Sequence, residues 1–330
     1  MRTFLFLGGS ILGLTAPAYA QDAADADAGP DEIVLASDAF EIDDDAITIT
    51  VTGNPSEVED TGQPVTVIGA QEIAQIQGPD LTRVLRRVPG VTINRTGGLG
   101  ATTGVSVRGG SADQLLVLID GVRVADTASP AGGFDFGTLT SLNLDKIELL
   151  RGANSVIWGA DALAGVLVAS TVERSGLGGS VEAGSRSTVA SSIEGGLASD
   201  IGFIGGSASY LTTDGFSAAS NGTEPDGFRQ FAVNGRARAY ISRTFEIIGS
   251  LRYADGTLDI DGFPAPSYTL GDTDEIQETS QLSGNLGAIY DGGALFLRGG
   301  YSFSDTARDN LPGPGEAATF ESDGHSDRLE

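Results

Sequence analysis

From about residue 178 onward, apolar or small side chains alternate with polar ones along the chain, with a period of two residues. This is the period of a β-strand, whose successive side chains point to opposite faces of a sheet. Between Phe231 and Ile241, apolar or small residues share one face, and polar residues that include Arg236 and Arg238 share the other. Similar runs are 180–185, 189–197, 201–211, 245–253, 281–290 and 294–303. The pattern predicts about seven antiparallel strands with unlike faces.

The connections between these strands alternate in length. Residues 199–200, 242–244 and 291–293 are tight, whereas 212–227 and 256–278 are long and polar. Short turns at one end and long loops at the other are typical of an outer-membrane β-barrel, and a soluble β-sandwich is the alternative. Strands of about ten residues, arginines on the inner face and aromatic strand ends favour the barrel.

The composition excludes several classes of protein. There is no cysteine and the single histidine is His325, so disulfide scaffolds, thiol catalysis and Cys/His zinc sites are ruled out. The formal net charge of −26 argues against a nucleic-acid partner. The basic residues are nearly all arginine, and we expect arginines inside a pore or interface to pair with the excess carboxylates.

The N-terminus has the features of an export signal. Residues 1–20 combine Arg2, an apolar stretch and the small-residue pattern Ala18-Tyr19-Ala20, which predicts a cleaved signal peptide. Residues 21–45 are rich in Asp and Ala and predict a flexible acidic linker. Residues 46–52 are alternating and β-branched, so they predict a short strand.

Short elements are expected in the middle of the chain. Residues 64–68 and 91–93 predict strands. Residues 79–90 predict a helix that Asp80 caps and Pro89-Gly90 ends. Residues 116–119 and 122–124 predict a hairpin around Asp120-Gly121.

Four segments together resemble the plug domain of TonB-dependent outer-membrane receptors. They are Val105–Gly110, Leu115–Arg123, Ile147–Gly152 and Trp158–Val166. The chain is most similar to the vitamin B12 (cobalamin) receptor branch. The resemblance implies an α+β plug domain at 53–175, followed at 176–330 by antiparallel transmembrane strands. Because a plugged lumen needs ~22 strands, we expect the chain to be truncated, ending within the first part of its barrel.

The resemblance also implies a function and a partner. It predicts a receptor in the outer membrane of a Gram-negative bacterium, in contact with lipid, for TonB-coupled uptake of a scarce cobalamin-like or siderophore-like nutrient, without catalysis. A passive porin or surface adhesin without energy coupling is the alternative. The predicted TonB box comprises Ile47, Thr48, Ile49, Thr50, Val51 and Thr52. The predicted substrate-binding residues are Thr96, Leu99, Thr102, Thr103, Asp126, Ser129 and Phe134.

In the B12 receptors, loop carboxylates bind Ca²⁺. The residues of this chain that match those positions are Glu224, Asp226, Asp255 and Asp261, and Ser217 stands where another acidic ligand is expected. Because Ca²⁺ needs several converging oxygens, we predict weak Ca²⁺ binding or none.

Overall fold

The computed structural model describes residues 64–126, 132–153, 158–171 and 173–329, together with the backbone of two short strands, β1 (Thr48–Ile49) and β2 (Ser56–Glu57). β1 and β2 pair antiparallel. Residues 45–330 form one compact unit. None of the helices in these ranges is long and apolar enough to cross a membrane.

The first half of this unit is a mixed α/β domain built on a five-stranded sheet, in the order β3-β8-β9-β6-β7. β6 and β9 are parallel and the other pairs are antiparallel. The interior strand β6 is buried along its whole length, because its two faces contribute to two different apolar clusters. The strands are β3 (Val65–Gly69), β6 (Leu115–Ile119), β7 (Val122–Val124), β8 (Leu144–Arg151) and β9 (Gly165–Thr171).

Two short helices precede this sheet's central strands in the sequence. α1 (Ala70–Ile76) buries Ile73 and Ile76, and α2 (Leu81–Leu85) is almost entirely buried. As predicted, the side chain of Asp80 caps α2 by accepting a hydrogen bond from the backbone N–H of Thr82. α2 ends five residues earlier than expected. The sequence did not predict α1, because a helical pattern of only two isoleucines in seven residues is too short to be recognised.

The remaining elements of this domain are a hairpin and three single turns of 3₁₀ helix. The hairpin joins β4 (Val91–Arg95) to β5 (Thr103–Val107). The 3₁₀ turns are η2 (Ala112–Gln114), η3 (Phe136–Thr138) and η4 (Ala160–Ala162).

The predicted turn between β6 and β7 is confirmed. Asp120 and Gly121 both have positive φ, 49° and 85°. Two successive residues in this region form the turn whose twist matches that of the flanking strands. The turn projects from the end of the buried strand β6.

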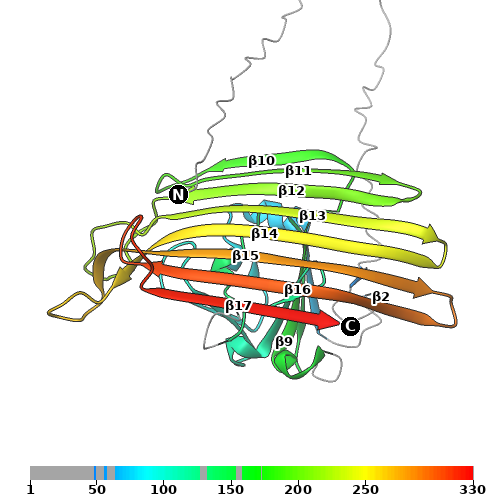
Figure 1. Cartoon of the computed structure of the whole chain (residues 1–330), viewed down its shortest axis with the longest axis horizontal. Coiled ribbons are helices and arrows are strands. Elements are labelled where there is room, and N and C mark those ends of the chain that lie inside the picture. Colours follow the sequence, from blue (N-terminus) through cyan, green and yellow to red (C-terminus); the bar gives the residue numbers. More distant parts are fainter. Residues whose placement is uncertain are drawn as a thin grey trace, which may run out of the picture. The chain divides into compact units, whose positions relative to one another are not determined.

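The second half is an open antiparallel sheet of eight strands, each paired with its neighbours in the sequence (Figure 1). The predicted succession of strands is confirmed. The strands are β10 (Gly176–Ala183), β11 (Val189–Ser199), β12 (Gly202–Thr213), β13 (Phe228–Ser242), β14 (Phe245–Gly262), β15 (Gly271–Asp291), β16 (Phe296–Leu311) and β17 (Phe320–Leu329).

Two details of the strand prediction were wrong. The expected loop 256–278 is largely strand, because β14 continues to Gly262 and β15 begins at Gly271. The eighth strand, β17, was not anticipated. The outward side chains of both regions are mostly polar, and the apolar Leu258 and Ile260 of β14 lie on the opposite face. The apolar outer face that marks the other strands is therefore absent there.

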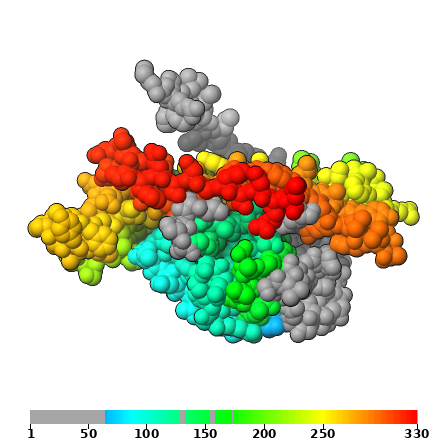
Figure 2. Space-filling model, turned by 60° about the horizontal axis from the view of Figure 1, so that its bottom comes forward, coloured from blue at the N-terminus to red at the C-terminus, as the bar shows by residue number. Residues whose placement is uncertain are grey.

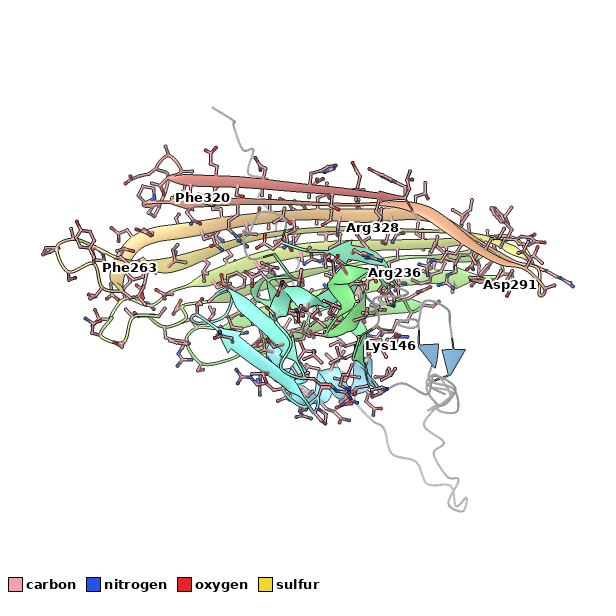
Figure 3. All side chains as sticks on the ribbon, turned by 90° about the horizontal axis from the view of Figure 1, so that it is seen from below. Lys146, Arg236, Phe263, Asp291, Phe320 and Arg328 are labelled. Carbon is pink, nitrogen blue, oxygen red and sulfur yellow. The ribbon has the colours of Figure 1, made fainter. Side chains whose placement is uncertain are left out.

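The mixed domain packs against one face of the large sheet and stands out from it in the space-filling view (Figure 2). Ala101 from the domain joins Ala190, Leu211, Phe228 and Leu258 from the sheet in one buried apolar cluster. We call this face the inner face and the opposite one the outer face. The long connections and the tight turns lie at opposite ends of the sheet, as the positions of Phe263 and Asp291 show (Figure 3).

Candidate functional site where the mixed domain meets the sheet

The β4–β5 hairpin carries three of the predicted substrate residues at its tip. Thr96 and Thr102 are exposed and joined by a backbone hydrogen bond of 3.2 Å from Thr96 N to Thr102 O. Leu99 is half-buried and packs on the apolar cluster that includes Phe228. Gly100 has a φ of 82°, and a Cβ there would lie 2.2 Å from the Phe228 ring. The hairpin tip is therefore held close against the sheet, with two threonines left open to ligand.

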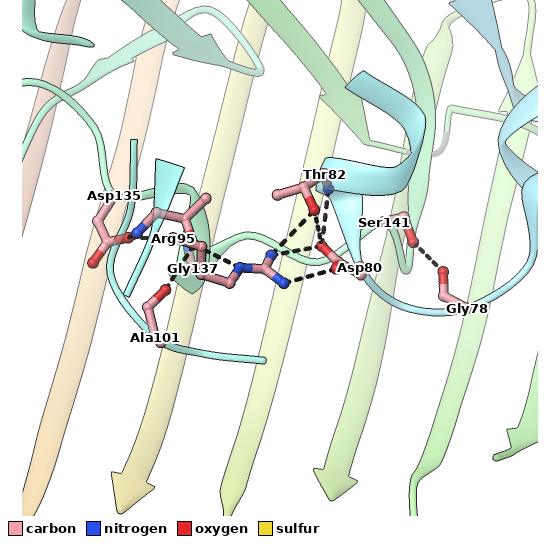
Figure 4. A network of polar contacts seen from close by, with 9 residues as sticks. Gly78, Asp80, Thr82, Arg95, Ala101, Asp135, Gly137 and Ser141 are labelled. Carbon is pink, nitrogen blue, oxygen red and sulfur yellow. Dashed lines mark hydrogen bonds and ion pairs between the residues drawn. The ribbon is translucent and has the colours of Figure 1, made fainter. Parts of the chain in front are cut away.

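Thr103 has a structural role instead. Its side chain is buried, donates to Ala101 O at 2.7 Å and accepts from Arg95 Nε at 3.0 Å. Its backbone N–H donates to Asp135 Oδ1 at 2.8 Å (Figure 4). The hydroxyl and the backbone N–H of Thr103 are thus engaged within the domain, and Thr103 supports the exposed Thr102 beside it.

Arg95 connects the hairpin to the start of α2. Its two Nη atoms donate to the two carboxylate oxygens of Asp80 at 2.9 and 2.8 Å (Figure 4). Burial alone would raise the pKa of Asp80, but the hydrogen bonds from Arg95 and Thr82 outweigh it and the pKa is lowered. A bidentate, partly buried pair of this kind fixes orientation as well as distance.

The second predicted substrate segment, 125–134, is largely internal where the structure describes it. Phe134 is buried and packs edge-to-face on Phe136, with ring centroids 5.0 Å apart. Asp126 is buried and accepts a hydrogen bond from Arg308 of β16 at 2.7 Å. Ser129 lies outside the described residues. Phe134 and Asp126 therefore hold the segment in place and present no open surface of their own.

Thr138, which the sequence did not single out, is the point where the inner face holds η3. Its carbonyl oxygen accepts from Gln230 Nε2 at 2.9 Å, and its hydroxyl accepts from Gln281 Nε2 at 3.2 Å. Arg252 Nη2 also approaches that carbonyl, at 3.5 Å. Side-chain amides and guanidinium groups of the sheet thus meet backbone groups of the mixed domain.

The Asp120-Gly121 turn makes a second polar junction. The Asp120 carboxylate accepts from the backbone N–H and the hydroxyl of Thr171, both at 2.8 Å. Arg236, which points from the sheet toward the domain (Figure 3), lies 3.5 Å from Asp120 Oδ1 and donates to Thr171 O at 2.9 Å. Arg236 also pairs with Glu173 at 2.8 Å. The expectation that arginines at an interface pair with carboxylates is confirmed here.

A cleft lies beside this junction, at the end of the sheet that carries the tight turns. It has a volume of about 730 Å³ and is lined by residues of both parts. Lys146 and Trp158 line it from the mixed domain, and Arg236, Arg243 and Glu246 line it from the sheet. The cleft is large enough for a small molecule and is lined with charge of both signs.

Two of the predicted calcium ligands lie close to one another around the 214–227 loop. Asp226 Oδ2 accepts from Ala218 N at 2.7 Å, and Asp261 Oδ2 accepts from Ala219 N at 2.6 Å and Ser217 Oγ at 3.0 Å. Burial raises the pKa of Asp226 to about 6, and Asp261, Asp259 and Asp272 add to that rise.

Asp272 belongs to this loop network and was missed by the sequence reasoning. It accepts from the backbone N–H groups of Thr223 and Glu224 at 2.7 and 3.0 Å and from Ser217 Oγ at 3.1 Å. No spacing rule links residue 272 to the loop at 223, so no sequence signal could have found it.

The other two predicted ligands do not complete a cage. Asp255 is exposed on the outer face of β14, where it accepts from Tyr253 OH at 3.3 Å. The backbone of Glu224 is tied to Asp272. In the described ranges, no group of three or more His, Cys, Asp or Glu side chains is arranged to hold a metal ion. Backbone N–H groups and Ser217 engage Oδ2 of Asp226, Oδ2 of Asp261 and both oxygens of Asp272, whereas Asp261 Oδ1 accepts no hydrogen bond from the described residues. Ca²⁺ would need more free oxygens to converge here.

The outer face carries an apolar band with a slanted upper edge. On each successive strand the last apolar outward residue before the polar end is Tyr210, Phe231, Tyr253, Leu282, Phe303 and Leu329. Between β12 and β17 there are five pairs of neighbouring strands. In two pairs the edge residues are direct register partners, and in the other three the edge residue of the later strand lies two residues farther from the polar end. With strands ~4.8 Å apart and a rise of ~3.3 Å per residue, the edge runs roughly 40° from the perpendicular to the strands, the tilt of strands in transmembrane barrels.

Comparison with known proteins identifies the mixed domain. Residues 57–166 match the family model described as the TonB-dependent Receptor Plug Domain. The chain is 33% identical over 197 residues to the vitamin B12 transporter BtuB of Photobacterium profundum, covering 58% of this chain and 32% of that protein. It is 42% identical over 105 residues to BtuB of Vibrio cholerae (strain M66-2), covering 32% and 17%. The chain thus spans about a third or less of these relatives.

Solved receptor structures share the fold of both parts. The alcaligin outer-membrane receptor FauA from Bordetella pertussis has a TM-score of 0.63 at 18% identity, covering 86% of this chain and 45% of that one. The ferric-catecholate import receptor Fiu from E. coli K12 has a TM-score of 0.61 at 15% identity, covering 84% and 45%. The open eight-stranded sheet corresponds to part of the barrel wall in such structures. We call this sheet the wall and the mixed domain the plug.

Proposed function

The chain carries the plug domain of the TonB-dependent receptors, and from this premise we propose that it serves active uptake of a scarce nutrient across the outer membrane of a Gram-negative bacterium. The match over residues 57–166 is the observation that carries the proposal. The apolar band on the outer face, with its barrel-like tilt, supports a position in lipid.

TonB is the proposed source of energy, acting through the box at Ile47–Thr52. A β-branched strand ahead of the plug suits capture by edge pairing with a partner protein. Thr48 and Ile49 lie in β1, and the remaining box residues lie outside the described ranges. Pulling on this segment transmits force to the plug, which the wall holds through polar contacts that water can replace and through the apolar cluster around Ala101.

The proposed substrate is cobalamin-like or siderophore-like. The relatives matched by sequence are named for vitamin B12, and the structures matched by fold are named for siderophores. Thr96 and Thr102 on the hairpin tip are the exposed plug residues that support this proposal, with Leu99 as their apolar neighbour. The chemistry is binding and release, without a covalent step.

Deletion of residues 47–52 tests the coupling. We expect uptake of radiolabelled substrate by intact cells to be lost, while binding to isolated outer membranes is retained. A matched deletion of six linker residues, 33–38, serves as the control and should leave uptake intact. Uptake that survives loss of the box would refute energy coupling.

A passive porin or adhesin is the second candidate. The plug argues against an open pore, because its η3 turn and its Asp120 turn are bonded to the inner face of the wall. Conductance in planar bilayers separates the two: the full-length receptor should stay closed, whereas a porin conducts without TonB.

A further inference from the structure

Two buried carboxylates of the plug share a single guanidinium group of the wall. Asp126 follows β7, and Asp135 caps η3. Arg308 Nη2 of β16 lies 2.7 Å from Asp126 Oδ2 and 3.7 Å from Asp135 Oδ2. The side chains are 6% exposed for Asp126, 5% for Asp135 and 12% for Arg308. Two negative charges are therefore buried beside one positive charge.

Each carboxylate has an oxygen without a hydrogen-bond partner. Asp135 Oδ1 accepts from the backbone N–H groups of Thr103 and Gly137 at 2.8 and 2.9 Å. Its Oδ2 and the Oδ1 of Asp126 are buried and accept no hydrogen bond, and Arg308 Nε is likewise buried without a partner in the described chain. A buried carboxylate oxygen left unpaired costs considerable free energy.

The other charged groups around the pair do not supply the missing positive charge. Arg95 is bonded through both Nη atoms to Asp80. Arg252 of the wall is buried, but its Nη1 donates to Gln281 and its Nη2 approaches the Thr138 carbonyl. Asp113, whose backbone packs on Gly133, adds a further, exposed carboxylate. On the wall, the register partners of Arg308 are Thr279 and Ser322, which carry no charge. Residues 127–131 contain no ionisable side chain.

We propose that Asp126 and Asp135 form a proton-binding site that holds one shared proton and thereby fastens the plug segment 132–138 to strand β16. The proton neutralises one of the two buried carboxylates, so that the net charge of the trio becomes zero. Closely spaced carboxylates titrate as a pair, one of them with a raised pKa.

The environment of Asp135 agrees with this site. Burial raises the pKa of Asp135 and the charge of Asp126 adds to that rise, against the opposing effects of the Thr103 and Gly137 N–H groups and of Arg308. A carboxyl whose pKa is raised in the fastened state binds its proton more tightly there than in the open state. The fastened state is thus favoured at low pH and loses this advantage as the pH rises through the raised pKa.

The site is argued from Asp126, Asp135 and Arg308, and neither the identity of the nutrient nor the TonB box enters that argument. The consequence of the site is that the plug opens more readily above the pH range in which the pair titrates than below it. Failure of the uptake proposal would leave it standing.

A cysteine placed at Thr138 reports the opening directly, since the chain has no other cysteine and Thr138 is buried against Gln230 and Gln281. Thiol labelling is measured in the full-length protein in detergent across a pH series. Each rate is divided by that of the same cysteine in the urea-unfolded chain at the same pH. We expect labelling to accelerate by up to about tenfold per pH unit through the titration range.

Asp135→Asn is the decisive variant. The asparagine carbonyl keeps the N–H donors of Thr103 and Gly137, and its amide group takes the position of Oδ2 without a charge, as the protonated carboxyl does. Its labelling should be slower than that of the otherwise wild-type protein at neutral pH and independent of pH. Asp113→Asn, which removes a nearby exposed carboxylate, is the matched control and should keep the wild-type profile.

Three results would overturn the site. One is a pH profile that Asp135→Asn leaves unchanged, which would mean that buried water satisfies the oxygens. Another is labelling that depends on Na⁺ or Ca²⁺ concentration and not on pH, which would place a metal ion there. The third comes from infrared spectra of the unaltered protein. If these spectra lack a protonated-carboxyl band that disappears in Asp135→Asn, the shared proton does not exist.

Discussion

Asn285 of the wall donates a hydrogen bond from Nδ2 to the backbone carbonyl of Asp120 at 2.7 Å, across 165 residues of sequence. The same amide lies 2.9 Å from Ser250 Oγ, which also approaches the Asp120 carbonyl at 3.4 Å. The turn that ends the most buried strand of the plug is therefore anchored on β14 and β15. Shortening this amide should loosen the plug without disturbing the wall.

We predict that Asn285→Ala destabilises the seating of the plug by about 1–3 kcal/mol, the cost of leaving a buried carbonyl partly unsatisfied. Hydrogen exchange of the Val122 and Arg123 amides in the full-length protein measures the effect. Asn94→Ala, at an exposed position of β4, is the control and should change exchange little. Equal protection in both variants would show that the Asn285 bond contributes nothing.

Local structure was the part of the fold that the sequence could predict. The Asp120-Gly121 turn, the Asp80 cap and the alternating strands each depend on residues close together in the chain, so spacing and residue type suffice. The prediction failed from residue 256 to 262, where β14 leaves the apolar band and its outward side chains become polar, while Leu258 and Ile260 lie on the inner face. The apolar residues thus change faces, and a loop was expected where the strand continues.

The contacts that fasten plug to wall could not be predicted. Arg308 and Asp126 are 182 residues apart and Gln281 and Thr138 are 143 apart. Neither pair is marked by a motif. Asp126 was singled out as a substrate ligand because it lies in a plug loop, but its burial against Arg308 is set by the packing of the domain on the sheet. Only the three-dimensional arrangement distinguishes a loop residue that faces ligand from one that faces the wall.

Gly100 allows the hairpin tip to approach the wall. Comparing its replacement with that of Gly109 should separate the effect of positive φ from the effect of the clash with Phe228. In Gly100→Ala, both the positive φ of 82° and the clash with the Phe228 ring oppose the new methyl group. In Gly109→Ala the φ of 79° is similar, but no atom lies within 4 Å of the added Cβ. The difference between the two variants therefore measures the contact of the tip with the wall.

We predict that Gly100→Ala is the more destabilising of the two, by about 1–3 kcal/mol, and that it weakens substrate binding by displacing Thr96 and Thr102. Thermal unfolding and equilibrium binding of substrate to outer membranes are the measurements. Similar values for both alanine variants would mean that the tip moves freely away from Phe228.

The Asp80–Arg95 pair predicts a pH dependence opposite in sign to that of Asp135. The pKa of Asp80 is lowered in the folded state, so the pair stabilises the plug above the unfolded pKa of about 3.9. That stability is lost as the pH falls through the lowered folded value. Asp80→Asn should therefore destabilise the plug at neutral pH and make little difference at the acid end of the range.

Chemical unfolding at a series of pH values tests this. Thr92→Ala, at an exposed position on β4 near Arg95, is the control and should shift stability equally at every pH. A loss in Asp80→Asn that is constant down to the acid end would show that the carboxylate charge has no part in the pairing.

The loop around Ser217 should bind Ca²⁺ weakly or not at all. The Ser217 hydroxyl lies 3.0 Å from Asp261 Oδ2 and 3.1 Å from Asp272 Oδ1, at a position where Ca²⁺ binding would need a further carboxylate. We expect calorimetry on the full-length protein to give a dissociation constant no tighter than the ~10⁻⁴ M of weak extracellular sites. Ser217→Asp replaces the hydroxyl between those carboxylates by a third carboxylate, so it should strengthen Ca²⁺ binding at least tenfold and destabilise the loop in the presence of a chelator. Ser220→Asp, outside the hydrogen-bonded network, is the matched control. Submicromolar affinity in the unaltered protein would contradict the prediction and would mean that the loop rearranges around the ion.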